Sequence, residues 1–374
     1  MLNIEIKAVS NQKDLKNFIK IVWKINSNDP YWVPPLLMDR IKILDRKKNP
    51  FFKHAEAEYF LAFRNGDLVG RIAAITNRRH NEFQKDNTGF FGFLEGVNDP
   101  QVFKILLDTA KSWLHTKGKD YMIGPMNPST NDEIGFLVDG FDTPPYFMMT
   151  HNPPYYGDIM KKLGYEKVKD VYAYHIQKDT FNMSEKLIKV SSVTKEKLGI
   201  AIRTVNLNDF KEELERIRYI YNNAWSKNWG FVPMTPEEFD YIAADFKKII
   251  DPELVLIAEK KGKPVGFSLA LPDYNRVFAK IKNGRLLPFG WIKFLTERKK
   301  IESLRIITLG VVQELQHIGI GGLFYVETFK RGTQKGYKSA EMSWILEDNE
   351  LMIKAINIMG GQQYKTYRIY GSSL

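Results

Sequence analysis

The sequence contains no cysteine, which excludes disulfide bonds, a thiol nucleophile and thiolate metal sites. Its six histidines are scattered and lack the H-E-x-x-H spacing of zinc hydrolases, so we expect no bound metal. No apolar run approaches the roughly 20 residues that a membrane-spanning helix needs. Residues 1–10 also lack the apolar block of a signal peptide, so we expect a cytoplasmic protein.

The composition is that of an ordinary globular protein, with 44% hydrophobic and 26% charged residues. A length of 374 residues indicates two or three domains. The 55 lysines and arginines exceed the 44 acidic residues and leave a net charge of +11. Such a surface attracts anions, which include phosphorylated cofactors, nucleic acid, anionic lipid and acidic carrier proteins.

The two halves of the chain repeat one another. Residues 4–9 and 200–205 share a strand-like alternation, and each is followed by an amphipathic pattern and a hairpin signal. Three pairs of glycines recur at one spacing of 196 residues: Gly66 and Gly262, Gly70 and Gly266, Gly164 and Gly360. We therefore predict two α+β domains of one mixed-sheet fold at 1–177 and 200–374, joined by a polar connector at 178–199.

The segment 309–325 predicts a strand that runs into a glycine-rich turn and then a helix. Glycines let a backbone approach a phosphate, and the first N–H groups of a helix attract anions. A Walker loop would require Gly-Lys-Ser/Thr, and a Rossmann fingerprint would require glycine where Phe324 stands, so both are excluded. The alternative is that Gly319, Gly321 and Gly322 only permit a tight turn and close helix packing.

Gln316-His317-Ile318-Gly319-Ile320-Gly321 resembles the Gln/Arg-x-x-Gly-x-Gly/Ala cofactor loop of the GNAT superfamily of acyl-CoA N-acyltransferases. The order of elements across the second copy matches that family as well. The resemblance implies tandem GNAT-like domains and transfer of an acyl group from acyl-CoA to a primary amine by direct attack, without a covalent enzyme intermediate. It assigns acyl-CoA binding to Leu309, Gly310, Val311, Val312, Gln316, His317, Ile318, Gly319, Ile320, Gly321, Gly322 and Asn349.

The first copy has Gly96-Val97-Asn98-Asp99-Pro100 where the loop should be, without the glycine pair, and Pro100 removes an N–H donor. We therefore expect the first domain to bind no cofactor and the chain to bind one acyl-CoA.

Amide formation from a thioester requires a neutral amine, a stabilised oxyanion and a proton for the thiolate. In the resembled family a backbone N–H near the end of the cofactor strand polarises the carbonyl, which points here to Val311 or Val312. Glu341 and Ser343 share one face of a strand and are candidates for the base or for holding a water molecule. The alternative is a carboxylate paired with a lysine of a neighbouring element. The opposite face is expected to be core: Met342, Trp344 and Leu346.

The general acid is harder to assign. Many GNAT enzymes place a tyrosine four residues before the glycine that ends the last helix, but Ile356 stands at that distance from Gly360. Tyr364 and Tyr370 are the replacement candidates, and at least one nearby tyrosine should be an ordinary packing residue.

Two further segments carry functional signals. Apolar and cationic residues interleave between Arg276 and Ile301, which suits a cover for an acyl chain, a membrane contact through 285–300, a docking site for an acyl carrier protein, or simply an amphipathic helix packed on its domain. The long loop 124–146 either recognises a small-molecule or peptide amine or is an ordered connector. Three alternatives remain open: an acyl-carrier-protein-dependent long-chain N-acyltransferase, a catalytically silent acyl-CoA-binding protein and, least favoured, a nucleic-acid binder.

Overall fold

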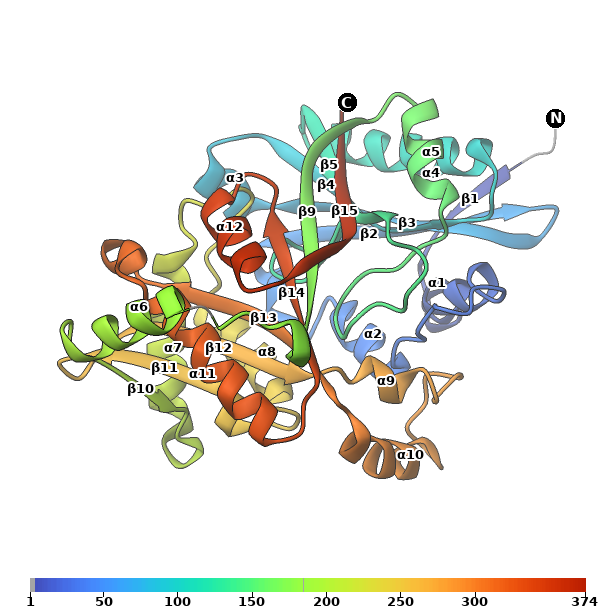
Figure 1. Ribbon diagram of the computed structural model, residues 1–374. Coiled ribbons are helices and arrows are strands. Elements are labelled where there is room, and N and C mark those ends of the chain that lie inside the picture. Colours follow the sequence, from blue (N-terminus) through green and yellow to red (C-terminus); the bar gives the residue numbers. More distant parts are fainter. Residues whose placement is uncertain (1–3, 184) are drawn as a thin grey trace. The chain divides into compact units, whose positions relative to one another are not determined.

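The computed structural model describes residues 4–183 and 185–374, and the chain divides into two compact units. Unit 1 comprises Met1–Val171, Val277–Leu295 and Lys365–Leu374, and unit 2 comprises Tyr172–Arg276 and Thr296–Tyr364. Both are mixed sheets covered by helices, as Figure 1 shows.

In unit 1 the strand order is β1-β2-β3-β4-β5-β15, where β15 spans Gln362–Ser373. Strands β4 and β5 are parallel, and β8 pairs with β15. The long helix α4 packs on one face of β2 to β4, and α1 packs on the other. The elements that lie wholly in this unit are β1 (Ile4–Ala8), α1 (Gln12–Ile25), α2 (Leu37–Ile43), β2 (Ala55–Arg64), β3 (Asp67–Asn77), α3 (Arg78–Gln84), β4 (Thr88–Gly96), α4 (Pro100–Thr116), β5 (Tyr121–Gly124), β6 (Met126–Asn127), β7 (Glu133–Ile134), β8 (Phe136–Asp139) and α5 (Tyr155–Lys162).

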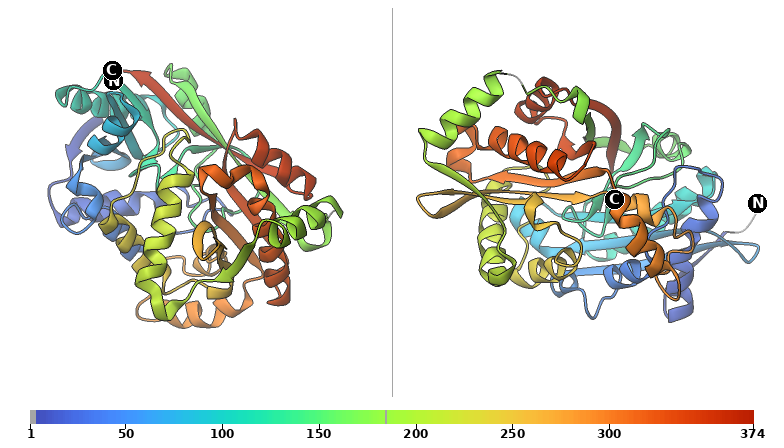
Figure 2. Two further views of the ribbon diagram at one scale, coloured as in Figure 1. Left: turned by 90° about the vertical axis from the view of Figure 1, so that its left-hand side faces the viewer. Right: turned by 60° about the horizontal axis from the view of Figure 1, so that its bottom comes forward.

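In unit 2 the strand order is β10-β11-β12-β13-β14, with β13 and β14 parallel. Figure 2 shows α11 and α7 on opposite sides of these strands. The elements that lie wholly in this unit are α6 (Glu185–Glu196), β10 (Ile200–Thr204), α7 (Phe210–Ala224), α8 (Pro236–Phe246), β11 (Val255–Lys260), β12 (Lys263–Pro272), β13 (Ser303–Val311), α11 (Ile320–Gln334), β14 (Ser339–Leu346) and α12 (Glu350–Ile358). Four elements contain a boundary between the units: β9 (Glu166–Gln177), α9 (Asn275–Phe278), α10 (Gly290–Glu297) and β15 (Gln362–Ser373).

The repeat extends to details of the backbone. The hairpin turns at Asn65-Gly66 and Lys261-Gly262 both have positive φ at their two central residues, as a tight hairpin turn requires. The hairpin β2–β3 has a register shift between Ala62 and Phe63, and β11–β12 has one between Ala258 and Glu259. These positions keep the 196-residue spacing of the glycines, so the two copies share one fold.

The units divide the chain differently from the predicted domains at four places. Residues 172–177, which the sequence assigned to the first domain, belong to unit 2. Residues 277–295 and 365–374, which the sequence assigned to the second domain, belong to unit 1. The predicted connector 178–199 contains the helix α6, which packs on α11 in unit 2. Ser184 in that connector and residues 1–3 of the first domain lie outside the described residues.

Candidate functional site

The parallel strands β13 and β14 pair over only four residues and then separate. Their register joins Ser303–Ile306 to Ser339–Met342, whereas β13 continues to Val311 and β14 to Leu346. On its other edge β13 has an extra residue, Ile307, because β12 pairs Leu269 with Thr308 and Ala270 with Ile306. The separation forms a V whose closed end, here called the apex, lies at the four paired positions.

One edge of β13 beyond the apex is left without a neighbouring strand in the described part of the chain. The N–H of Val312 donates to the carbonyl of Val265 at 2.9 Å, so it bonds toward β12. Successive N–H groups of a strand point to opposite edges, and the N–H of Val311 therefore faces the open side. Of the two donors expected from the sequence, Val312 is engaged within the sheet and Val311 is the one that the V leaves accessible.

The glycine-rich turn leads directly into α11. After a short 3₁₀ helix (Gln313–Ile318), Gly319 has φ of +91° and forms the N-cap of α11 without any side-chain cap. A helix N-terminus with uncapped N–H groups and a glycine cap is suited to an anion. The corresponding helix of unit 1 differs, because the Asp99 carboxylate accepts from the N–H of Gln101 at 2.8 Å and pairs with Arg64.

Side chains around the turn hold its backbone in place. The Gln316 amide donates to the carbonyls of Ala224 and Val311, both at 3.2 Å, and the Thr194 hydroxyl donates to the carbonyl of Ile318 at 2.9 Å. His317 is exposed, whereas Ile320 is fully buried. The predicted cofactor residues of this turn are thus adjacent in space, with Gln316 acting as a brace.

At two of the predicted glycines, close packing leaves little room for a side chain. A Cβ on Gly310 would lie 2.3 Å from the Trp225 indole, and one on Gly322 would lie 3.3 Å from Leu187 of α6. A Cβ on Gly321 would meet only Leu309, at an ordinary 3.8 Å. Close packing therefore explains part of the glycine pattern, and Gly321 is the position where it does not.

A buried polar cluster occupies the apex. Arg305 of β13 and Glu341 of β14 are direct register partners, with 2% and 0% of their side chains exposed. The Arg305 Nε lies 3.5 Å from Glu341 Oε1 and donates to Ser343 Oγ at 3.0 Å, and Ser343 in turn donates to Glu341 at 2.7 Å. The Tyr364 hydroxyl donates to the other carboxylate oxygen. We call these four residues the apex cluster.

The structure thus brings together three predicted catalytic residues, Glu341, Ser343 and Tyr364. The partner of Glu341 is an arginine and not the lysine considered from the sequence. Arg305 was missed, although an arginine in the otherwise apolar strand 303–311 is itself a signal that a buried acid lies nearby. The carboxylate of Glu341 is already held by three donors. Tyr364 is partly exposed, so its hydroxyl is the group of the cluster best placed to contact a substrate.

The predicted alternation of β14 holds only as far as Ser343. Met342 is core as expected, but the Arg305 guanidinium lies 5.1 Å from the ring centroid of Trp344, and Ile345 packs with the Met342 cluster instead. The prediction that Trp344 belongs to the core face is therefore wrong. Beyond Met342 the strand has left its ladder with β13, so that ladder no longer fixes which face each side chain takes.

His175 is a second residue that sequence analysis missed. Its ring lies 5.8 Å from that of Tyr364, and burial together with the nearby Arg276 lowers its pKa. A neutral imidazole beside the apex cluster is a potential proton acceptor. Its only sequence signal was a histidine within a tyrosine-rich strand.

The other predicted residues have structural contacts. Tyr370 is fully buried in the core of unit 1, where its ring lies 6.4 Å from Phe136, so the structure does not group it with the apex cluster. The Asn349 side chain accepts from the N–H of Met352 and caps α12. Ile356, at the usual tyrosine position, is a fully buried core residue.

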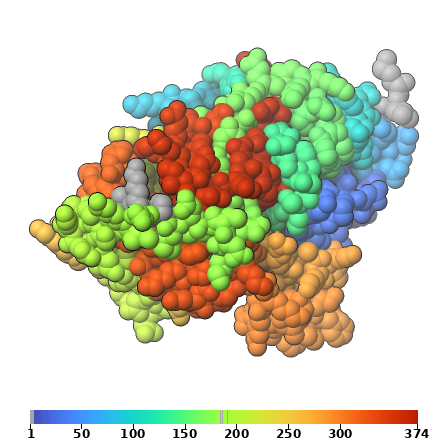
Figure 3. All heavy atoms as spheres, viewed as in Figure 1, coloured from blue at the N-terminus to red at the C-terminus, as the bar shows by residue number. Residues whose placement is uncertain are grey.

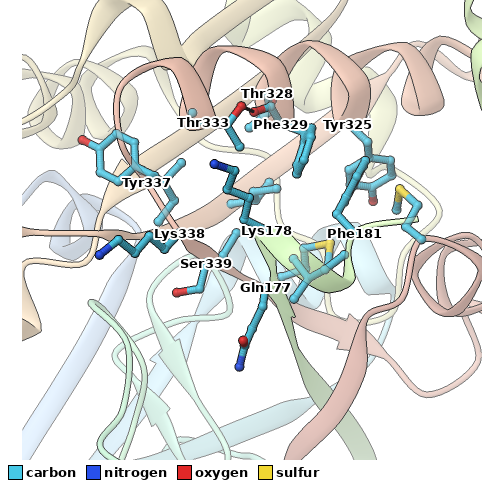
Figure 4. A pocket seen from close by; sticks show the side chains of 17 residues that line it. Gln177, Lys178, Phe181, Tyr325, Thr328, Phe329, Thr333, Tyr337, Lys338 and Ser339 are labelled. Atoms are coloured by element: carbon cyan, nitrogen blue, oxygen red, sulfur yellow. Dashed lines mark hydrogen bonds between the residues drawn. The ribbon is translucent and has the colours of Figure 1, made fainter. Parts of the chain in front are cut away.

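An apolar pocket with a cavity volume of about 50 Å³ lies between α11 and the apex ends of β13 and β14. Figure 4 shows Phe181, Phe329 and Tyr325 on one side and Tyr337 and Lys338 on the other, with Lys178 between them. The rings of Phe181 and Phe329 are stacked with centroids 3.9 Å apart. Leu304, Ile306, Ala340 and Met342 line its floor. Because these residues alternate with Arg305 and Glu341, the pocket and the apex cluster lie on opposite faces of the two strands.

In unit 1 the long loop 124–146 is ordered by its own polar contacts. Arg40 binds both carboxylate oxygens of Glu133, at 2.8 and 2.5 Å, and the Asn127 side chain accepts from the N–H of Phe93 at 2.6 Å. These contacts account for the loop as a connector, and recognition of an amine by it stays a prediction.

Two absences concern the described residues alone. Among them no helix has the length and apolar character needed to cross a membrane. No cluster of three or more potential His, Asp or Glu ligands for a metal ion is found in residues 4–183 and 185–374.

The fold is that of the GNAT acetyltransferases. A tandem GNAT protein from the clavulanic acid biosynthesis pathway superposes with a TM-score of 0.58 over 99% of this chain and 98% of its own, at 10% identity. A GCN5-related N-acetyltransferase from Sphaerobacter thermophilus superposes with a TM-score of 0.53 over 100% of this chain and 97% of its own, at 14% identity. The GCN5-related glucosamine N-acetyltransferase region of a fungal multi-domain protein gives 0.58 at 15% identity and covers 100% of this chain but only 38% of that longer one. These structures show the tandem GNAT fold predicted from the sequence.

Closer relatives define the family. No protein-family model matches the chain. It is 37% identical to the bacterial ceramide synthase of Caulobacter vibrioides, over 100% of this chain and 98% of that protein. It is 36% identical to the protein YghO of Escherichia coli K12, over 98% of this chain and 94% of that protein. The chain therefore has the tandem GNAT fold and belongs to the family that includes bacterial ceramide synthase and YghO.

Proposed function

We propose that this protein transfers a long acyl chain from acyl-CoA to the primary amine of a lipid-like amino alcohol, producing an amide. The relative named ceramide synthase supports this acceptor class, because a ceramide is an N-acylated long-chain amino alcohol. The observation that carries the proposal is the combination in unit 2 of an open strand edge at Val311 with an uncapped helix N-terminus at Gly319.

The residues of unit 2 fit a CoA thioester. The α11 N-terminus offers N–H groups and a positive dipole end to a pyrophosphate. The open edge of β13 offers backbone groups to an extended pantetheine arm, as a missing strand would. The bound thioester supplies an activated carbonyl, and the remaining chemistry falls to side chains and backbone of this chain.

The proposed reaction is direct attack. The amine nitrogen forms a bond to the carbonyl carbon while the N–H of Val311 stabilises the negative charge on the carbonyl oxygen. The C–S bond then breaks, the ammonium loses a proton and the thiolate gains one. We assign the proton for the thiolate to Tyr364, and to Glu341 the role of a positioning residue that orients the tyrosine hydroxyl through its hydrogen bond. His175 is the proposed acceptor for the amine proton.

The pocket on the α11 face supports a substrate with a hydrocarbon chain. Its walls are mostly apolar, and its volume in this conformation holds only a short part of such a chain, so a longer one requires the Phe181–Phe329 stack to move. An acyl carrier protein as donor and a silent acyl-CoA-binding role are the alternatives that experiment must separate.

Calorimetric titration with CoA and a long-chain acyl-CoA tests the cofactor site. Gly319→Asp places a carboxylate at the N-terminus of α11, where it occupies the anion position. Gly336→Asp is a matched control, because Gly336 has nearly the same φ, +90° against +91°, but follows the C-terminus of α11 with no atom within 4 Å of its Cβ position. Both changes impose the same backbone strain of about 1 to 2 kcal/mol.

We expect one site per wild-type chain, at least a 100-fold loss of CoA affinity in Gly319→Asp and wild-type affinity in Gly336→Asp. Equal loss in both variants would show that backbone strain, and not the anion position, is responsible. Turnover is measured separately as release of free CoA thiol with a long-chain amino alcohol, and formation of the amide is verified by mass. Binding without release of thiol would favour the silent alternative.

A further inference from the structure

The 277–295 segment of unit 1 presents an exposed apolar surface. Five large side chains on it are substantially exposed: Leu287 (74%), Phe289 (72%), Trp291 (47%), Ile292 (45%) and Leu295 (41%). Such residues normally face the core, and a contiguous exposed group of them marks an interaction site. Among the described residues no other stretch of similar length contains so many of them.

The segment is firmly attached to unit 1 in spite of its exposed side chains. Its inner side is packed, with Val277 and Ile281 almost fully buried and the rings of Phe278 and Phe294 stacked at 6.3 Å. The Trp23 indole N–H donates to the carbonyl of Lys282 at 2.7 Å, and two neighbouring backbones are joined by a bond from the N–H of Leu37 to the carbonyl of Gly284. The apolar side chains are therefore held outward by an anchored segment.

The neighbouring helix α2 also exposes apolar side chains. Leu37, which bonds to the segment, begins this helix, and one turn of it exposes Met38 (60%) and Ile41 (50%). Figure 3 shows the orange atoms of the 277–295 segment on the surface of the molecule.

The charge of the segment is of one sign. It contains four cationic residues and no acidic one, and all four are exposed: Lys280, Lys282, Arg285 and Lys293. An apolar surface that serves as a protein interface is usually depleted of lysine. Tryptophan and phenylalanine beside lysine and arginine are instead typical of helices that lie in the interface of an anionic bilayer.

We propose that the 277–295 segment docks the protein onto the surface of an anionic phospholipid membrane. The apolar side chains enter the headgroup region and the four cations contact lipid phosphates. The proposal goes beyond acyl transfer and does not require it, because it concerns binding of the protein to lipid in the absence of substrate.

The test is co-sedimentation of the full chain with vesicles of phosphatidylcholine alone and of phosphatidylcholine with phosphatidylglycerol. We expect binding to the anionic vesicles, which weakens with salt, and little binding to the neutral ones. Leu287→Ser should weaken binding roughly tenfold. Leu351→Ser is the matched control, because Leu351 is similarly exposed (70%) but lies on α12 in unit 2.

Charge is tested in the same way. Lys282→Gln with Arg285→Gln should weaken binding by about fivefold for each charge removed. Lys13→Gln with Lys16→Gln removes the same charge from exposed positions on α1 and should leave binding unchanged. A blue shift of tryptophan fluorescence on vesicle addition should be lost in Trp291→Phe.

No binding to anionic vesicles would overturn the proposal, and so would equal weakening in each variant and its control. Because these measurements use no acyl-CoA, a failure here leaves the CoA titration unaffected. Loss of CoA binding in Gly319→Asp likewise says nothing about docking.

Discussion

Replacement of Glu341 by glutamine separates the structural role of the apex cluster from its chemical role. The change keeps the shape of the side chain but removes the charge that faces Arg305, of whose side chain only 2% is exposed. An uncompensated buried charge costs about 3 to 5 kcal/mol, whereas loss of a single hydrogen bond costs about 1 to 2 kcal/mol. We expect Glu341→Gln to lower the free energy of unfolding by the larger amount and Tyr364→Phe by the smaller.

The assay is chemical denaturation followed by circular dichroism, with the rate of CoA release measured on the folded variants. In Arg305→Met with Glu341→Gln the buried charge is removed together with its partner. That double variant should therefore lose about 1 to 3 kcal/mol less than the sum of the two single losses. Additive losses would refute the direct ion pair.

Activity gives the second readout. Tyr364→Phe should lower kcat by roughly 100-fold with little change in KM, because general acid catalysis contributes about 10² to 10⁴. If Tyr364→Phe keeps full kcat while Glu341→Gln loses it, the tyrosine is not the acid and the carboxylate acts by itself.

Two further predictions concern titration and the apolar pocket. Burial lowers the pKa of His80 and His151 from the ordinary 6.5, so both are neutral in the folded state at pH 7. The unfolded chain takes up these protons below about pH 6.5, so this contribution to stability is present above that pH and is lost as the pH falls toward the lowered values. The fall in unfolding free energy from pH 7 to 5, measured by chemical denaturation, should therefore be smaller in His80→Gln than in the wild type. Ala340→Phe fills the floor of the apolar pocket and should shift the preference of the enzyme to acyl-CoA substrates with shorter chains. Ala201→Phe, at an exposed position of β10, should leave the preference unchanged. The assay is competition between acyl-CoA substrates of different chain length.

The fold was largely predictable because its sequence pattern occurs in both halves of the chain. A single strand-helix-hairpin pattern is ambiguous, but the glycine pairs at a constant spacing placed both hairpins and their turns correctly. The partners of β15 were not predictable. Alternation in 362–373 indicates a strand, yet nothing local specifies that Tyr370 to Ser373 pair with β5 of unit 1. Long-range pairing depends on which edge is open, and that is a property of the assembled sheet.

The site was predictable where it depends on backbone and less so where it depends on side-chain partners. Glycines at 319–322 signal an unusual backbone, so the turn could be located from its residues. Val311 and Val312 could not be distinguished, because their N–H directions follow from the pairing of Val312 with Val265 and not from side-chain identity. The role of Glu341 required its partner Arg305, which is adjacent in register but 36 positions away in sequence.

A comparison of the two copies indicates why a buried ion pair is present at the apex. In unit 1 the equivalent parallel strands pair Thr88 with Tyr121, Gly89 with Met122 and Phe90 with Ile123, without any charged pair. The fold itself therefore does not require one. In unit 2 the strands pair over four residues and then separate. A salt bridge between direct register partners adds a second link at that end, and the same carboxylate holds the Tyr364 hydroxyl. The carboxylate that pairs with Arg305 thus also positions the hydroxyl to which the proposed mechanism assigns the proton for the thiolate.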